Sequence, residues 1–322
     1  MTEPWGAFPA RPAGAQTGPV STDTVAATRT PVSPEFVRGT AAMGVSAVSN
    51  QVGAAVGTLA FSAIGPAGVV AVRQLVAAAV LLPVARPPFR RFTWAQWWPP
   101  LLLGLVFATM NLSLYTAFSR IELGLAVTLE FLGPLTVALV GSRSRLDLGC
   151  ALLAGAGVYV LVLPGPSSDW LGLGLALLAA GCWASHILLT RLVGARLPGL
   201  QAPAAATSVS ALIYLPVVIV LLVQRRLTGL PLLCAVAVGV LASALPYAAD
   251  VMALRRVSTR FFGVFMSLNP VLAAFAGLVL LGQVLAWHQW LGIALVVLAN
   301  AVAVTVAGRR TRLSPVVGEA GP

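Results

Sequence analysis

Ten stretches of apolar residues, each about long enough to cross a bilayer as a helix, fill this chain between residues 39 and 307. A hydrocarbon core of roughly 30 Å needs about 20 apolar residues in helical form. We therefore predict an all-α polytopic membrane protein with ten transmembrane helices. The predicted spans are 39–63, 66–85, 99–119, 122–142, 147–164, 171–192, 203–223, 231–254, 262–282 and 287–307.

The composition agrees with a membrane protein, because 58% of the residues are hydrophobic and only 9% are charged. A soluble domain carries about a quarter of charged residues. The net charge of +11 would suggest a nucleic-acid partner in a soluble protein. Here the positions of the arginines explain the charge through topology and attraction to lipid head groups, so no nucleic-acid partner is expected.

When the N-terminus is placed in the cytoplasm, most arginines fall on the cytoplasmic side of the membrane and few on the opposite side. Short loops rich in arginine stay in the cytoplasm, which predicts that both termini are cytoplasmic and that the number of spans is even. The tryptophans Trp94, Trp170 and Trp287 lie at span ends, as expected of anchors in the head-group layer. The cytoplasmic set is Arg38, Arg86, Arg90, Arg91, Arg143, Arg145, Arg191, Arg196, Arg255, Arg256, Arg260, Arg309, Arg310 and Arg312, and the opposite set is Arg120, Arg225 and Arg226.

The chain divides into two tails and two halves. Residues 1–37, rich in Pro, Thr, Ala and Gly, are predicted to form a disordered cytoplasmic tail without a cleaved signal peptide. Residues 38–166 and 167–307 are the two halves, each of five spans, and residues 308–322 form a short basic cytoplasmic tail. Three cysteines lie inside spans without CxxC spacing and suggest neither a disulfide nor a metal site.

The two halves contain a repeat. Segment 109–134 aligns with segment 245–270 at an offset of 136 residues, which matches Arg120 with Arg256 and Pro134 with Pro270. Because five spans separate the copies, they enter the membrane in opposite orientations, as in transporters whose binding site lies between inverted repeats. The alternative is a chance similarity between two segments rich in alanine and leucine.

The two matched prolines predict breaks in their helices. A proline has no N–H for the carbonyl four residues earlier, so Pro134 frees the carbonyl of Glu130 and Pro270 frees that of Met266. Irregular backbone at membrane depth survives beside protein or a wet cavity. Both prolines therefore indicate a central cavity, although each alone is also consistent with a tolerated kink.

Away from the span ends, four acidic, basic or histidine side chains fall within spans: Arg73, Glu130, His186 and Asp250. A lone charge at the centre of a span costs at least about 2.5–3.5 kcal/mol, so such residues usually mark transport paths. Arg73 and Glu130 lie at similar depth, which predicts an ion pair between them. That pair would serve either transport or helix packing.

The other two ionisable residues have simpler interpretations beside the functional ones. Asp250 is close in sequence to Arg255 and Arg256, so a salt bridge at the cytoplasmic rim is an alternative to a role in transport. His186 is expected to be packed or hydrogen-bonded, with proton handling as the less favoured reading.

Neutral polar residues complete the predicted site. Amides and phenols inside spans either bond neighbouring helices or face substrate, and Asn50 and Gln51 belong to this group. Trp183 lies inside the sixth span and either packs or lines a cavity. The residues predicted to bind substrate are Arg73, Asn111, Tyr115, Glu130, Trp183, Tyr247, Asp250 and Asn269, with helix breaks at Pro134 and Pro270.

Three classes of function fit a chain of this kind: a secondary transporter, an integral-membrane enzyme and a receptor. An enzyme would need a nucleophile with a base, or clustered metal ligands, and neither set is recognisable. A receptor would usually carry a soluble sensory domain. No Walker motif is present, and we predict no cofactor and no obligate protein partner. The favoured reading is a secondary transporter of a small molecule, with proton coupling left open.

The stretch MNLSLYTAFSRIELGLAVTLEFLGPLTVAL at 110–139 resembles the third and fourth spans of EamA-type drug/metabolite transporters. It is most similar to the threonine/homoserine exporter subfamily, with its motif LEFxGPLxVAL. Segments 245–270 and 68–78 resemble the corresponding regions. The resemblance implies ten helices in two five-helix repeats and export of an amino acid such as threonine or homoserine across a bacterial plasma membrane. Another small metabolite or a cationic drug is the alternative substrate.

The chain departs from that subfamily at three acidic positions. Asn269 and Gln283 stand where the subfamily usually has glutamate, and Asp250 stands where glutamate is usual. Two acids are therefore replaced by neutral amides. These departures put the typical substrate choice and coupling in question, but not the fold.

Overall fold

A computed structural model describes residues 34–140, 145–163, 168–194 and 201–313, and the secondary structure in these ranges is entirely helical. The predicted tail up to residue 33 lies outside them. The first helix begins before residue 38 and the last continues past residue 307. The elements are α1 (Pro34–Thr58), α2 (Phe61–Ala85), η1 (Phe89–Arg91), α3 (Trp94–Phe118), α4 (Leu123–Glu130), α5 (Leu132–Leu139), α6 (Arg145–Val162), α7 (Trp170–Gly194), α8 (Gln201–Val223), α9 (Gly229–Gly239), η2 (Val240–Ala244), α10 (Leu245–Leu254), α11 (Thr259–Met266), α12 (Asn269–Leu281) and α13 (Trp287–Leu313).

Eight helical segments in the described ranges are long and apolar enough to cross a membrane. The predicted all-helical, multi-pass fold is thus confirmed, whereas the count of ten spans remains a prediction. The remaining two predicted spans correspond to α1, which carries several polar residues in its middle, and to α4 with α5. The latter form a shorter apolar stretch, Leu123–Leu139, interrupted at Phe131.

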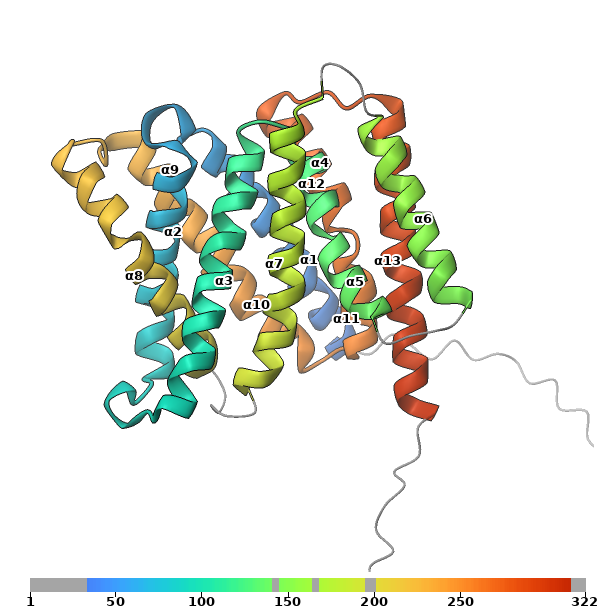
Figure 1. The fold of residues 1–322 in the computed structure, drawn as a ribbon, viewed down its shortest axis with the longest axis horizontal. Helices are drawn as coiled ribbons and strands as arrows, with labels where there is room; N and C mark the ends of the chain where they lie inside the picture. Colours follow the sequence, from blue (N-terminus) through green and yellow to red (C-terminus); the bar gives the residue numbers. More distant parts are fainter. Residues whose placement is uncertain (1–33, 141–144, 164–167, 195–200, 314–322) are drawn as a thin grey trace, which may run out of the picture. The chain divides into compact units, whose positions relative to one another are not determined.

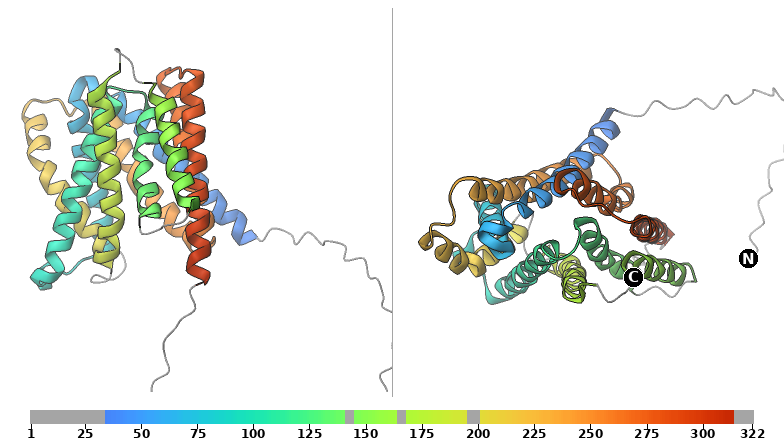
Figure 2. Two further views of the ribbon diagram at one scale, coloured as in Figure 1. Left: turned by 45° about the vertical axis from the view of Figure 1, so that its right-hand side comes forward. Right: turned by 90° about the horizontal axis from the view of Figure 1, so that it is seen from above.

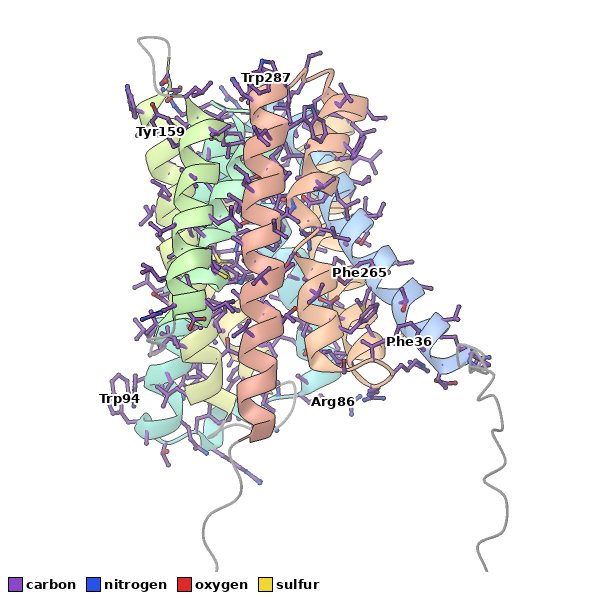
Figure 3. All side chains as sticks on the ribbon, turned by 90° about the vertical axis from the view of Figure 1, so that its right-hand side faces the viewer. Phe36, Arg86, Trp94, Tyr159, Phe265 and Trp287 are labelled. Atoms are coloured by element: carbon purple, nitrogen blue, oxygen red, sulfur yellow. The ribbon has the colours of Figure 1, made fainter. Side chains whose placement is uncertain are left out.

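The helices run between two ends of the bundle (Figure 1). We call the end that carries η1, the α10–α11 turn and the start of α1 the arginine-rich end. The opposite end carries the α3–α4 turn, the start of α7 and the α12–α13 turn. Trp94 lies toward the first end and Trp287 lies at the second, both pointing outward (Figure 3) and both more than 70% exposed. Such a distribution is typical of tryptophans at two membrane interfaces.

The packing crosses between the two halves of the sequence. Helix α7 packs against α3, α4 and α5, while α1 packs against α10, α11 and α12. Helices α2 with α8, α4 with α12, and α6 with α13 form further pairs. Figure 2 shows α1 beside the orange segments of the second half and α7 beside the green segments of the first.

The turn between the first two helices differs from the predicted boundary. The chain turns at Leu59 and Ala60, whose N–H groups bond to Val56 and Gly57, so α1 ends at Thr58 rather than at residue 63. The apolar run 59–64 hides this turn, because its residues are as hydrophobic as the helices on either side. A kink follows at Gly65 (φ 68°), directly before Pro66, where the second span was predicted to begin.

Three helices are interrupted near the middle of the bundle. The break at Phe131 separates α4 from α5 three residues before Pro134, and Ser267 and Leu268 separate α11 from α12 just before Pro270. The predicted span 231–254 contains a third irregularity, the π-helix η2, which Pro246 follows. π-helical turns of this kind are frequent at functional sites. The sequence reading missed this one.

Candidate functional site

A cavity of about 810 Å³ lies in the centre of the bundle, and all eight residues predicted to bind substrate line it. They come from six helices: α2, α3, α4, α7, α10 and α12. Pro134 lines the cavity as well, while Pro270 is buried directly after the lining residue Asn269. Other lining residues are Ser46, Asn50, Gln51, His186, Thr207, Ser243 and Asn300.

The lining of the cavity spans much of the bundle, from Phe118 at the end of α3 to residues near the arginine-rich end. Its lining includes Ala202 and Pro203 at the start of α8, Asp250 near the end of α10, and Phe262 near the start of α11. These residues all belong to the halves of their helices that face that end. The cavity therefore reaches into the half of the bundle nearer the arginine-rich end.

Arg73 joins three helices through neutral acceptors. Its Nε donates to Ser243 Oγ at 3.0 Å, its Nη1 to Asn111 Oδ1 at 2.6 Å, and its Nη2 to the carbonyl oxygen of Ala242 at 2.8 Å. Pro246 explains the last contact, because it supplies no N–H to the carbonyl four residues earlier, which is that of Ala242. A guanidinium group from α2 thus satisfies the backbone that a proline leaves open in the eighth predicted span.

An aromatic cluster around Tyr115 lies beside Arg73. The guanidinium carbon of Arg73 is 5.3 Å from the centre of the Tyr115 ring, within the range of cation–π attraction. The Tyr115 ring contacts Phe118 at 5.2 Å and Phe61 at 6.3 Å between centroids. The Tyr115 hydroxyl is buried beside the Arg73 guanidinium, and Tyr115 lines the cavity.

The predicted ion pair between Arg73 and Glu130 does not form. Ion pairs between described residues are Arg38–Glu35, Arg120–Asp169 and Arg256–Glu35. Glu130, the last residue of α4, is 8% exposed and lines the same cavity. Arg73 faces neutral oxygens instead, because the carbonyl freed by Pro246 and the side chains of Asn111 and Ser243 surround its donors. Glu130 therefore presents a carboxylate to the cavity without a salt bridge.

Asp250 lies on the same cavity but not in the rim salt bridge considered as an alternative. Arg256 pairs with Glu35, 2.9 Å from its carboxylate, and Asp250 lies next to the hydroxyl of Ser46. The buried Oδ1 of Asp250 has no partner in the described part of the chain. A second carboxylate with a free oxygen thus faces the half of the cavity nearer the arginine-rich end.

Asn269 completes the backbone at the break between α11 and α12. Its Nδ2 donates to the carbonyl of Met266 at 2.9 Å, the carbonyl that Pro270 frees. Its Oδ1 accepts from Gln51 Nε2 at 2.9 Å, which ties α12 to α1. A glutamate at this position could accept the hydrogen bond from Gln51 but, when ionised, could not donate to Met266.

Trp183 and His186 form the wall contributed by α7. The Trp183 ring meets the Phe131 ring edge-on at 4.8 Å, and the His186 ring lies 5.5 Å from that of Phe107. Both residues line the cavity. His186 is thus packed against an aromatic ring, as its simpler interpretation predicted.

Several groups at the site were not singled out from the sequence. Ser46, Ala242 and Ser243 hold Asp250 or Arg73, and Pro246 produces the free carbonyl. The available signal was Pro246, a proline in the interior of a predicted span. Serines and alanines are too common in membrane helices to be recognised from one sequence.

We expect Asn269→Asp to lower stability more than Asn300→Asp. The first change leaves the Met266 carbonyl without a donor, at a cost of about 1–3 kcal/mol. Asn300 also lines the cavity and donates to the carbonyl of Val296 at 3.0 Å, but it lies within the unbroken helix α13, whose backbone bond remains. Thermal unfolding of both purified variants measures the difference. Equal melting temperatures would contradict this account of Asn269.

Comparisons with known proteins agree with a membrane transporter. Residues 170–305 match the model of the EamA-like transporter family. The threonine/homoserine exporter RhtA of Salmonella typhimurium (strain LT2) is 36% identical over 255 residues, covering 78% of this chain and 86% of that protein. RhtA of Escherichia coli (strain K12) is 34% identical over 259 residues, covering 80% and 88%. A solved structure described as "Crystal structure of protein" shares the fold, with a TM-score of 0.55 and 20% identity over 86% of this chain and 99% of that one.

Proposed function

Because this chain belongs to the EamA family of transporters and is not an enzyme, we propose that it exports a small amino acid such as threonine or homoserine. The proposal includes alternating access by a fold of ten transmembrane helices in two inverted five-helix repeats. It also includes the plasma membrane of a bacterium as the location, with both termini in the cytoplasm.

One observation carries the proposal: the cavity presents an arginine, two carboxylates and amide groups at membrane depth. An amino acid carries an ammonium and a carboxylate, so groups of both signs complement it. Glu130 and Asp250 have no ion-pair partner among the described residues and are suited to an ammonium. Arg73 uses three of its five N–H groups on the protein, which leaves two for a carboxylate.

Alternating access is supported by the packing between the two halves. The contacts of α7 with α3, α4 and α5 correspond to those of α1 with α10, α11 and α12, as expected for a pseudo-two-fold axis in the membrane plane. The breaks before Pro134 and Pro270 occupy matching positions in this scheme. A cavity that reaches into the half of the bundle at the arginine-rich end fits loading of substrate from the cytoplasm.

We expect reporter fusions to place both termini and the loop 86–93 in the cytoplasm, and residues 163–169 outside. The reason is the concentration of arginines at one end of the bundle, since short arginine-rich loops are retained in the cytoplasm. Paired alkaline phosphatase and green fluorescent protein fusions at each position provide the measurement. A periplasmic C-terminus would contradict the even number of spans.

A second candidate function is export of a cationic metabolite. The cavity is lined by two carboxylates and by one arginine, Arg73, which is already bonded to neutral oxygens. If Arg73 does not bind substrate, the two carboxylates favour a cationic substrate. The two candidates differ in whether a carboxylate on the substrate is required.

Transport into everted membrane vesicles tests both candidates. We expect uptake of labelled threonine or homoserine above that of vesicles without the protein, and competition by unlabelled amino acid but not by its decarboxylated amine. Competition by the amine alone would favour the cationic candidate. Dissipating the proton gradient with an ionophore separates proton-coupled export from facilitated diffusion. No uptake of any amino acid or amine would contradict the proposal.

A further inference from the structure

Two ion pairs at opposite ends of the bundle are built from the same parts, and neither touches the cavity. The first, which we call the α7 clamp, consists of Arg120, Asp169 and Gly172. Arg120, in the α3–α4 turn, is bidentate on Asp169, with Nη2–Oδ2 at 3.0 Å and Nε–Oδ1 at 3.1 Å. Asp169 Oδ1 also accepts from the Gly172 N–H at 2.8 Å. This backbone bond, followed by the bond to Arg120, holds the pKa of Asp169 below its usual range.

The α7 clamp depends on a glycine for close approach. A β-carbon added at Gly172 would lie 2.9 Å from Ile121 Cγ2 and 3.1 Å from Arg120 Cβ. The α3–α4 turn thus rests directly on the first turn of α7.

The second contact, the α1 clamp, consists of Glu35, Gly39 and Arg256. Arg256, in the α10–α11 turn, pairs with Glu35 in the first turn of α1, with Nε–Oε2 at 2.9 Å. A β-carbon at Gly39 would lie 2.7 Å from Val257 Cγ1 and 2.9 Å from Arg256 Cβ. Both clamps therefore combine an acid, an arginine, a glycine and a β-branched residue after the arginine. The acid precedes the glycine by three residues in the α7 clamp and by four in the α1 clamp.

The sequence repeat matches the arginines of the two clamps but not their acids and glycines. Arg120 and Arg256 match at the offset of 136 residues, but each acid and glycine lies on the first helix of the other half or, for Asp169, directly before it. Each clamp therefore joins the first helix of one half to the turn between the third and fourth predicted spans of the other. The start of α1 lies at the arginine-rich end and the start of α7 at the opposite end (Figure 1).

We propose that the two clamps fasten α1 to α10–α12 and α7 to α3–α5, so that the units that move in transport each combine helices of both halves. This inference rests on the proposed transport function, because it concerns the motion by which the cavity changes sides. The two sequence halves, residues 38–166 and 167–307, are then not the moving bodies. An exposed ion pair is individually weak, but here it adds to a tight backbone approach and to packing along both helices.

The two proposed units meet at the opposite end, where α4 packs on α12. A β-carbon at Gly124 would lie 2.8 Å from Ala274 Cβ, and Gln283 Oε1 accepts from the Leu123 N–H at 3.0 Å. Alternating access requires this contact to open when the cavity turns to that end. The contact between α4 and α12 is therefore the expected moving interface, and the clamps are the expected fixed ones.

Three engineered disulfides test this division with matched geometry. The pairs are Arg120→Cys with Gly172→Cys, Gly39→Cys with Arg256→Cys, and Gly124→Cys with Ala274→Cys. Their β-carbons would be 3.1, 2.9 and 2.8 Å apart, so each needs only a small adjustment toward the distance in natural disulfides, about 3.8 Å. The background replaces the native cysteines Cys150, Cys182 and Cys234 with alanine.

We expect the two oxidised clamp pairs to keep about half or more of the export rate, because they link helices that move together. We expect the oxidised Gly124–Ala274 pair to lose export by about tenfold or more and to regain it on reduction. A loss of export in either oxidised clamp pair, restored by reductant, would overturn the proposal. Full export by the oxidised Gly124–Ala274 pair would also overturn it.

Spin-label distances test the same units without a transport assay. Labels at the exposed positions Val45 on α1 and Met252 on α10 should give one distance under all conditions. Labels at the exposed positions Leu171 on α7 and Val279 on α12 lie in different units and should give two distances. Two distances within the α1 unit would contradict the clamps. If the distances are as expected but the protein exports no amino acid or amine, the proposed function is contradicted and the division into two units is supported.

Discussion

Replacing Arg73 with glutamine should abolish export and unfold the protein at a markedly lower temperature. The change removes a donor from Ser243, Asn111 and the carbonyl of Ala242, which together join α2, α3 and η2. Leaving a buried acceptor without its donor costs about 1–3 kcal/mol, and Pro246 supplies no N–H to the carbonyl of Ala242. A loss of about 100-fold in export, which corresponds to about 2.8 kcal/mol, is expected in everted vesicles.

Two further variants separate the roles of Arg73. Arg73→Lys keeps the charge but cannot reproduce a planar fork on three acceptors, so it should recover little of the melting temperature. Arg90→Gln removes an exposed arginine from η1 and should leave both export and melting temperature unchanged. If Arg73→Gln exported and melted like the unchanged protein, Arg73 would neither bind substrate nor hold the site together.

Glu130→Gln should abolish export while leaving the melting temperature unchanged or raised. Glu130 is buried and has no ion pair with Arg73, so the substitution strands no partner. It also removes a charge whose burial costs at least about 2.5–3.5 kcal/mol inside a membrane helix. The loss of export, again about 100-fold, would come from the missing carboxylate that meets the ammonium or a proton.

The matched control for Glu130 is the second carboxylate of the cavity. Asp250→Asn should reduce export less, because Asp250 lies nearer the arginine-rich end than Glu130 and the amide keeps an oxygen next to the Ser46 hydroxyl. Export should be measured over a range of pH for both variants. If Glu130→Gln exports at the unchanged rate at every pH, then Glu130 is neither an ammonium ligand nor a proton carrier. A larger loss in Asp250→Asn would move that role to Asp250.

The sequence was sufficient to predict the class of protein and the composition of the candidate site. Apolar runs of helical length leave few other folds, because membrane segments need about 20 such residues. Charged and amide groups inside those runs are costly and therefore informative on their own. For this reason Arg73, Glu130, Asp250 and Asn269 were identified in advance, and the structure brings them to one cavity.

The partner of each polar group was decided by the tertiary structure. Depth along a helix correctly placed Arg73 and Glu130 near one another, but the ion pair inferred from depth was wrong. The carbonyl of Ala242, freed by a proline 173 residues after Arg73, lies within reach of the guanidinium instead. Likewise, Arg256 pairs with Glu35 rather than with its neighbour Asp250. The sequence determines which polar groups need a hydrogen-bond partner, because the free-energy cost of leaving such a group unpaired inside the membrane depends on that group alone. The partner that each group finds depends on how helices far apart in the sequence pack, because a hydrogen bond requires the two atoms to lie within about 3 Å.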